Sequence, residues 1–256
     1  MKRTLALLVL VAGALAMVSQ ADSRTAPTAV ERVTGHWFGY FQSSLTGEVG
    51  SFDLAIPFQQ NRRFAGTLSS PTLPRSIPFD GTLAASDRFS VIGHVSSDLN
   101  FRVKGVVKFF NETKTFGRAT ADYDLTTPAG RDEGSLLFLQ SFDVPNAAQL
   151  PPRMSGGFTR DDGQKGTISV ELGQKGSDFE GVGMFGDLPF PFRGSIGAFA
   201  PGGAPVHAIS VSPYATITID CQWLDGVLIG GVNASFADGS VHTASFFLRA
   251  GGVSGD

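Results

Sequence analysis

The side chains best suited to acid–base chemistry in this sequence are three aspartates and one histidine. Asp122 and Asp124 lie two positions apart, so their carboxylates fall on the same face of a strand. Paired carboxylates could hydrolyse a glycoside or bind a cation, although a solvated strand face is the simpler interpretation. His36 and Asp220 complete the set of residues that an enzyme acting in a barrel cavity could use.

Metal and nucleophilic sites have no support in the sequence. It contains no HxH, HExxH or CxxC motif and no G-x-S-x-G nucleophile elbow. Cys221 alternates with Ile219 and Trp223 on an apolar face, where a buried thiol is usually inert. We therefore predict neither a metal nor a cofactor. The histidines are spread along the chain, at His36, His94, His207 and His242.

A basic stripe alternates with apolar residues on another segment. Arg102, Lys104 and Lys108 share one face of the expected strand 99–110. They could pair with Asp122 and Asp124 on a neighbouring strand, because opposite charges across a sheet stabilise it. The alternative is a barrel interior that binds an anion.

The composition limits which classes of protein are possible. Of the 256 residues, 42% are hydrophobic and 17% are charged, which argues against wholesale disorder. The 32 glycines lack a three-residue period, so collagen is excluded. The 22 phenylalanines fall mostly on alternating positions, which indicates core packing or an apolar cavity.

Residues 1–21 have the features of a signal peptide. Lys2 and Arg3 precede an apolar stretch at 5–18, which at about 14 residues is short for a bilayer span of roughly 20. Cleavage after Ala21, or earlier after Ala16, would leave 22–33 as an N-terminal segment. An N-terminal membrane anchor is the alternative. We expect export to the periplasm or the extracellular space, with no integral membrane span after cleavage.

The mature chain is mildly acidic. Without Lys2 and Arg3 it carries 18 basic and 23 acidic residues, a formal charge of −5. A protein whose main task is binding nucleic acid needs a basic surface, so we predict no nucleic-acid partner.

Alternation with a period of two recurs along the chain and predicts strands. Ser51–Phe58, Leu99–Phe109 and Thr216–Trp223 each place apolar residues on one face. Asp225-Gly226 and Asp238-Gly239 separate such segments and predict tight hairpin turns. No convincing amphipathic helix follows the leader.

The fold that these patterns predict is all-β, with two tandem antiparallel up-and-down barrels. Eight strands in each of two regions, 34–142 and 154–250, would remove exposed edges by closing. A single sandwich-like body built from both regions is the alternative. Residues 143–153 contain three prolines and are predicted to be a linker, and 251–256 form a tail. Strands are expected near 34–42, 50–58, 62–69, 76–83, 88–96, 99–110, 114–125 and 133–142, and near 154–160, 165–173, 178–186, 189–198, 205–212, 214–223, 227–237 and 240–249.

The two regions look like copies of one unit. Phe64-x-Gly66 matches Phe179-x-Gly181 at a spacing of 115, and Gly81 matches Gly194 at 113. At a spacing of 113, however, the charged face around Lys104 would fall on apolar positions. A one-residue shift, from a bulge or a changed turn, is therefore expected in that part of the second copy.

The start of the first region resembles the calycin signature of lipocalins and avidins. The motif is Gly35-x-Trp37 on the first strand, and Phe158 replaces the tryptophan in the second copy. The resemblance implies that Trp37 closes one end of a barrel whose interior holds an apolar ligand. The aromatic candidates for ligand binding are Trp37, Tyr40, Phe101 and Trp223.

The first strand is aromatic on both faces. His36, Phe38 and Tyr40 lie opposite Trp37 and Phe41. Only one face can line a barrel interior, so the other must be covered by the second copy, a ligand or a membrane. We expect the second copy to cover it.

These observations favour an exported, non-enzymatic β-barrel protein that binds a hydrophobic small molecule or lipid. One alternative is a structural or interaction module of the cell envelope or extracellular space, with an envelope protein as partner. The others are a cavity enzyme, such as an isomerase, cyclase or hydrolase, and an outer-membrane barrel.

Overall fold

The computed structural model describes residues 31–73, 75–96, 98–111 and 116–250. The predicted signal peptide, most of segment 22–33 and the tail 251–256 lie outside these residues. The described residues contain sixteen strands and no helix. Consequently, none of them belongs to a helix long and apolar enough to cross a membrane.

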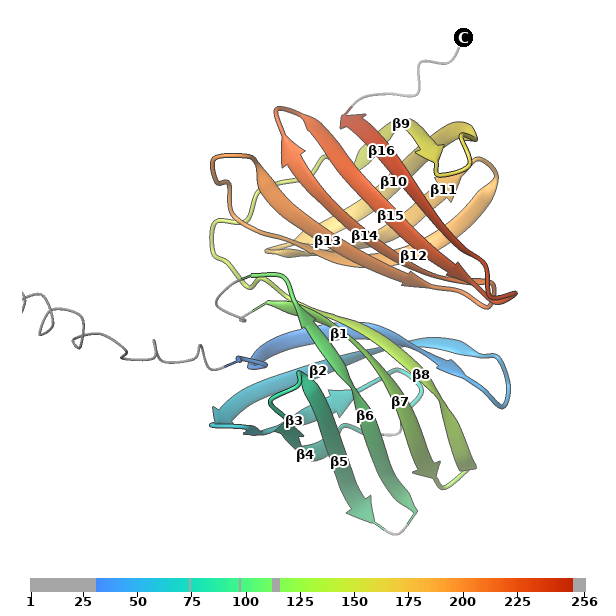
Figure 1. The fold of residues 1–256 in the computed structure, drawn as a ribbon. Coiled ribbons are helices and arrows are strands. Elements are labelled where there is room, and N and C mark those ends of the chain that lie inside the picture. Colours follow the sequence, from blue (N-terminus) through green and yellow to red (C-terminus); the bar gives the residue numbers. More distant parts are fainter. Residues whose placement is uncertain (1–30, 74, 97, 112–115, 251–256) are drawn as a thin grey trace, which may run out of the picture. The chain divides into compact units, whose positions relative to one another are not determined.

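The strands form two closed antiparallel barrels of eight strands each, which confirms the predicted fold class (Figure 1). Each strand pairs with its neighbours in sequence, and β1 pairs with β8 as β9 pairs with β16 to close the barrels. Barrel 1 consists of β1 (Gly35–Ser43), β2 (Val49–Gln60), β3 (Arg63–Ser69), β4 (Ile77–Leu83), β5 (Arg88–Ser96), β6 (Leu99–Phe109), β7 (Gly117–Thr127) and β8 (Gly130–Gln140). Barrel 2 consists of β9 (Arg153–Arg160), β10 (Lys165–Lys175), β11 (Asp178–Phe185), β12 (Leu188–Ile196), β13 (Ala204–Val211), β14 (Ala215–Leu224), β15 (Val227–Phe236) and β16 (Val241–Ala250).

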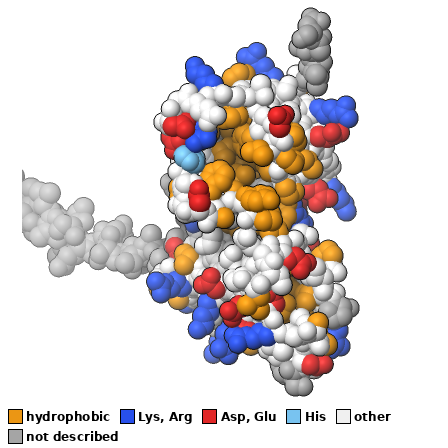
Figure 2. All heavy atoms as spheres, turned by 90° about the vertical axis from the view of Figure 1, so that its right-hand side faces the viewer, with side chains coloured by type: hydrophobic (Ala, Val, Ile, Leu, Met, Phe, Trp, Pro, Cys, Tyr) orange, Lys and Arg blue, Asp and Glu red, His pale blue; other side chains and the backbone are white. Residues whose placement is uncertain are grey.

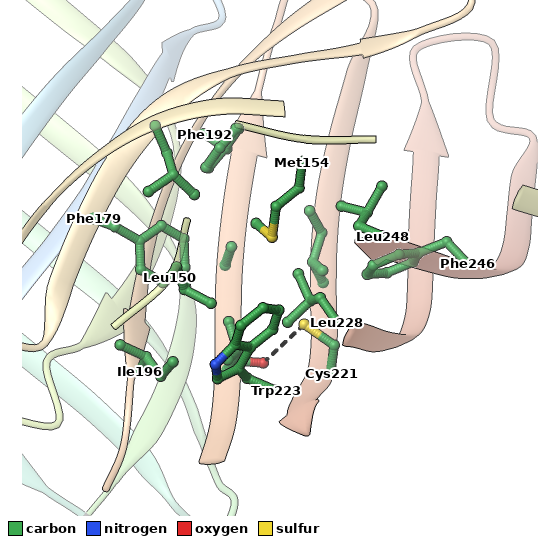
Figure 3. Packing of buried hydrophobic residues seen from close by; sticks show 14 of the residues in the cluster. Leu150, Met154, Phe179, Phe192, Ile196, Cys221, Trp223, Leu228, Phe246 and Leu248 are labelled. Carbon is green, nitrogen blue, oxygen red and sulfur yellow. Dashed lines mark hydrogen bonds between the residues drawn. The ribbon is translucent and has the colours of Figure 1, made fainter. Parts of the chain in front are cut away.

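Side chains fill the central part of both barrels. The cavity left among the inward-facing residues is about 30 Å³ in barrel 1 and about 40 Å³ in barrel 2, room for little more than one water molecule. Figure 3 shows the packing in barrel 2, where Leu150 of segment 143–152 joins the core. The Cys221 thiol donates to the Val206 carbonyl at 3.5 Å, and burial raises its pKa, as expected for an inert cysteine.

Phenylalanine rings lie over glycines on the neighbouring strand in both barrels. The ring of Phe64 occupies the space that a Cβ at Gly81 would need, and Phe179 does the same at Gly194. These pairs are the residues that repeat at spacings of 115 and 113, so the duplication is visible in the packing. A glycine at these positions lets a large ring lie flat against the sheet.

The expected one-residue shift between the copies is present. Ala121 and Ala234 both face inward and lie 113 residues apart. Their partners on the preceding strands, Gly105 and Ile217, lie 112 residues apart. The charged face of β6 therefore points outward, and so does the corresponding face of β14 in the second copy.

The outer face of the first strand packs against the second barrel, as expected from its sequence. Both barrels belong to one compact unit that begins at Arg32. Phe38 and Tyr40 of β1, with Leu137 and Leu139 of β8, form a buried cluster with barrel 2. The barrel 2 members of this cluster, on β13, are Ile209 and Val211.

Two arginines cross this contact from opposite sides. Arg193 of β12 donates to Asp53 at 2.7 Å and lies over the Phe38 ring at 4.9 Å. Arg118 of β7 donates to Asp220 at 3.0 Å. Charge-assisted hydrogen bonds of this kind fix the orientation of an apolar contact.

His36 bridges two carboxylates of different barrels. Its Nε2 lies 3.1 Å from Asp53 Oδ1 and its Nδ1 lies 3.3 Å from Asp178 Oδ2. The hydrogen bonds to Asp178 and Asp53 raise the pKa of His36 from 6.5 to about 9, against the opposing effect of burial. Burial also acts to raise the pKa of Asp53, but the hydrogen bonds from His36 and Arg193 outweigh it and lower that pKa.

Replacing Gly194 by alanine tests the packing of ring over glycine. A Cβ there would overlap the Phe179 ring and approach the His207 carbonyl oxygen to 2.7 Å. We expect Gly194→Ala to lower the free energy of unfolding by about 1–3 kcal/mol in urea denaturation. Gly173→Ala is the control, because its Cβ would meet nothing within 4 Å. An equal loss in both variants would contradict the packing argument.

The His36 bridge predicts a stability difference that depends on pH. The folded-state pKa lies above the ordinary value, so the stabilisation is complete below about pH 6.5 and is lost as the pH rises through about 9. We expect the Tm difference between wild type and His36→Gln to be largest below about pH 6.5 and to disappear above about pH 9. His242→Gln, on barrel 2 away from the contact, is the control. A difference that is constant with pH would refute the bridge.

Candidate functional site

The largest apolar-floored cavity described in barrel 1 lies at the end where the β1–β2, β3–β4 and β7–β8 turns meet. Its volume is about 330 Å³. We call it the mouth of barrel 1. Apolar side chains form its floor, among them Phe41, Phe52, Leu68, Phe101, Val103 and Leu136. Polar side chains form its rim, among them Thr46, Glu48, Ser70, Thr72, Arg131 and Asp132.

The corresponding end of barrel 2 is occupied by phenyl rings. At the repeat spacings of 115 and 113, Ser70 and Ile77 of barrel 1 correspond to Phe185 and Phe190. The Phe185 ring stacks on Phe190 at 4.7 Å and meets Phe158 edge-on at 5.3 Å. Figure 2 shows hydrophobic side chains gathered at this end of barrel 2. Ser70, which lines the open mouth, thus corresponds to a phenylalanine at the filled end.

A polar group of three residues stands at the edge of the barrel 1 mouth. Asp132 of β8 accepts a hydrogen bond from the Tyr123 hydroxyl at 2.7 Å and another from the Ser43 hydroxyl at 2.6 Å. Gly134 is the cross-strand partner of Tyr123, and a Cβ there would overlap the Gln42 carbonyl oxygen and lie 3.0 Å from the Tyr123 ring. Burial, and then the bond to Asp132, raise the pKa of Tyr123 above its ordinary value. The phenol therefore stays protonated and donates to a carboxylate.

A second depression lies on the outer face of barrel 2. It has a volume of about 550 Å³ and is open to solvent. Its lining is mostly small and polar, including Thr159, Thr218, Asn233, Thr243 and Ser245. It offers hydrogen bonds but no apolar floor comparable to that of the mouth.

The structure separates the four residues predicted to bind a ligand. Phe101 lines the mouth of barrel 1. Trp37 lies deeper in the core of that barrel, and its indole donates to the Val33 carbonyl at 2.8 Å. Tyr40 lies on the outer face, in the contact with barrel 2. Trp223 is buried in the core of barrel 2.

The four acid–base candidates do not come together in one site. Asp122 is exposed on the outer face of β7, and Asp124 forms an ion pair with Arg131 at 2.9 Å. His36 and Asp220 both lie at the contact between the barrels but have different partners. No cluster of three His, Cys, Asp or Glu side chains that could hold a metal occurs among the described residues.

The basic stripe faces outward, so the idea that it lines an anion-binding interior is wrong. Arg102, Lys104 and Lys108 are exposed because they alternate with the buried Val103 and Val107 on β6. The register places the first two of these cations directly opposite the acids of β7. The pairs are Arg102 with Asp124 and Lys104 with Asp122.

Sequence reasoning missed Asp132 and its two partners. The sequence predicts a strand near 133–142, which places Asp132 in the preceding turn, whereas β8 begins at Gly130. With the correct start, Asp132 shares the inward face with Gly134 and Leu136. An acid on an otherwise apolar face is the signal that could have identified it.

Comparisons with known proteins leave the family open. No protein-family model matches the chain, and no curated protein matches it in sequence. One similar solved structure is a protein of unknown function of the DUF3598 family from Nostoc punctiforme, with 12% identity, a TM-score of 0.28 and coverage of 86% of this chain and 96% of that chain. Another is a provisionally named outer membrane protein from Bacteroides fragilis, with 10% identity, a TM-score of 0.30 and coverage of 86% and 98%. Such remote similarities carry no argument, and membership of the calycin family stays a prediction.

Removing the Tyr123 hydroxyl tests the polar group at the mouth. We expect Tyr123→Phe to lower the free energy of unfolding by about 0.5–1.5 kcal/mol, because the half-buried Asp132 loses one donor. Urea denaturation provides the measurement. Tyr214→Phe is the matched control, since that tyrosine is 78% exposed and should change stability little. Equal effects in the two variants would argue against a structural hydrogen bond at Asp132.

Proposed function

We propose that this chain is an exported, non-enzymatic protein that binds a small hydrophobic molecule or lipid in the mouth of barrel 1. The observation that carries the proposal is the cavity of about 330 Å³ with an apolar floor and a polar rim. Small-molecule sites usually combine an apolar lining with a few polar groups that orient the ligand. The volume is at the small end of the usual range of roughly 300–1,000 Å³.

The position of the cavity indicates which part of barrel 1 a ligand would occupy. The central parts of both barrels leave only about 30 and 40 Å³, so a ligand would enter the mouth without threading the barrel. Phe101 and Phe52 would contact its apolar part, and Asp132 would face its polar part. The proposed location outside the cytoplasm depends on the leader-like residues 1–21.

An interaction module of the cell envelope is the second candidate function. It is favoured by large apolar side chains at the filled end of barrel 2. Leu188 is 73% exposed and Val241 is 56% exposed there, and both stand at turns between strands. The cavity-enzyme alternative has less support, because its candidate residues are dispersed.

Blocking the mouth tests the proposed function. The probe is N-phenyl-1-naphthylamine, an apolar dye whose fluorescence rises in a dry site. We expect wild type to bind it and Leu68→Trp to weaken binding at least about tenfold, because the indole would occupy the cavity. Ile92→Trp, an equally bulky change at a position 56% exposed on β5, is the control. No binding by wild type, or equal binding by both variants, would overturn the proposal and favour the interaction module.

A further inference from the structure

The hydroxyl hydrogens nearest Asp132 are already used within the protein. Ser43 and Tyr123 each have one hydroxyl hydrogen, and each donates it to a different oxygen of Asp132. Neither hydrogen is therefore available to a ligand in the mouth, and the Ser43 oxygen already accepts from the backbone N–H groups of Leu45 and Thr46. A carboxylate oxygen can accept more than one hydrogen bond, so Asp132 retains acceptor capacity.

Three further hydroxyl groups on the rim also donate their hydrogens within the protein. Ser70 donates to the Ser51 carbonyl at 2.7 Å. Because its hydrogen is committed, Thr72, 3.0 Å away, must be the donor in the bond between these two hydroxyls. Thr127 donates to the Gly130 carbonyl at 3.2 Å. The rim thus offers a ligand more acceptors than donors.

The charged residues around the mouth also favour a ligand whose polar end donates hydrogen bonds. Glu48, Asp132 and Arg131 are the charged residues that line it. Arg131 binds Asp124 at 2.9 Å and Glu133 at 3.3 Å, so its positive charge is balanced by acids outside the cavity. The field at the cavity is consequently negative, which favours a cation over an anion.

We propose that the mouth of barrel 1 selects ligands whose polar end donates hydrogen bonds, an alkyl or aryl ammonium first and an alcohol second, and that it discriminates against carboxylates. This inference rests on the proposed function. The ligand's donor binds Asp132, and its apolar part lies on the floor formed by Phe52 and Phe101. The volume corresponds to about eleven water molecules, which suits a chain of medium length.

A series of three ligands that share one chain tests the selection. Octylammonium, octanol and octanoate differ only in their polar end, and each is titrated calorimetrically at neutral pH below its aggregation concentration. We expect octylammonium to bind about tenfold or more tighter than octanoate, with octanol between them. Tighter binding of octanoate would overturn the inference and identify Arg131 as the partner of the head group.

Two variants assign the selection to Asp132. Asp132→Asn should reduce the preference for octylammonium over octanoate to about twofold or less, while octanol still binds. Asp122→Asn removes the same charge from the exposed outer face and should leave the preference unchanged. If the Asp132→Asn protein is unstable, Glu48→Gln removes the other acid that lines the mouth and should also weaken the preference, and an unchanged preference there would overturn the inference.

The outcomes separate this inference from the proposed function. If none of the three ligands nor the naphthylamine dye binds, the proposed function fails. If all three bind with equal affinity, the mouth is a binding site without selection, and only the inference fails. A preference that persists in Asp132→Asn would also overturn it.

Discussion

Side chains fill the centre of both eight-stranded barrels, and this constraint governs the rest of the structure. Phenylalanine rings occupy part of that interior, and the large rings fit because glycines face them, as Gly81 faces Phe64 and Gly194 faces Phe179. Because the centre is full, a cavity can form only where the barrel opens. At the mouth of barrel 1, Ser70 stands where barrel 2 has Phe185.

The two copies have thus kept one scaffold and diverged at their ends. In barrel 1, the phenol of Tyr123 crosses Gly134 to reach Asp132, an arrangement that needs a hydroxyl at the ring. At the repeat spacing of 113, the second copy has Phe236, which cannot make that bond. The two copies therefore differ at this end, where barrel 2 is filled by rings and barrel 1 has a polar group beside an apolar floor.

Strand number, barrel closure and the covered outer face of β1 could be predicted from alternation, because each follows from which side chains share a face. The polar group at Asp132 could not, because it depends on where β8 begins and on the register that sets Tyr123 diagonally across from Asp132. The acids that the sequence does single out, Asp122 and Asp124, lie on the outer face of β7. The size of the interior was also beyond the sequence, since it depends on how the rings of Phe64 and its neighbours pack.

The contact between the barrels joins unlike surfaces, so nothing in its geometry alone would stop a third unit from adding to the second. Such head-to-tail contacts generate open filaments when the receiving surface is repeated. Here it is not repeated. Arg118 and Gly231 correspond at the spacing of 113. In barrel 1, Arg118 pairs with Leu139 on the next strand, and Leu139 pairs with Phe38. In barrel 2, Gly231 pairs with Ser245, and Ser245 pairs with Thr159. The polar depression on barrel 2 therefore lacks the apolar side chains that barrel 1 presents at the contact between the barrels.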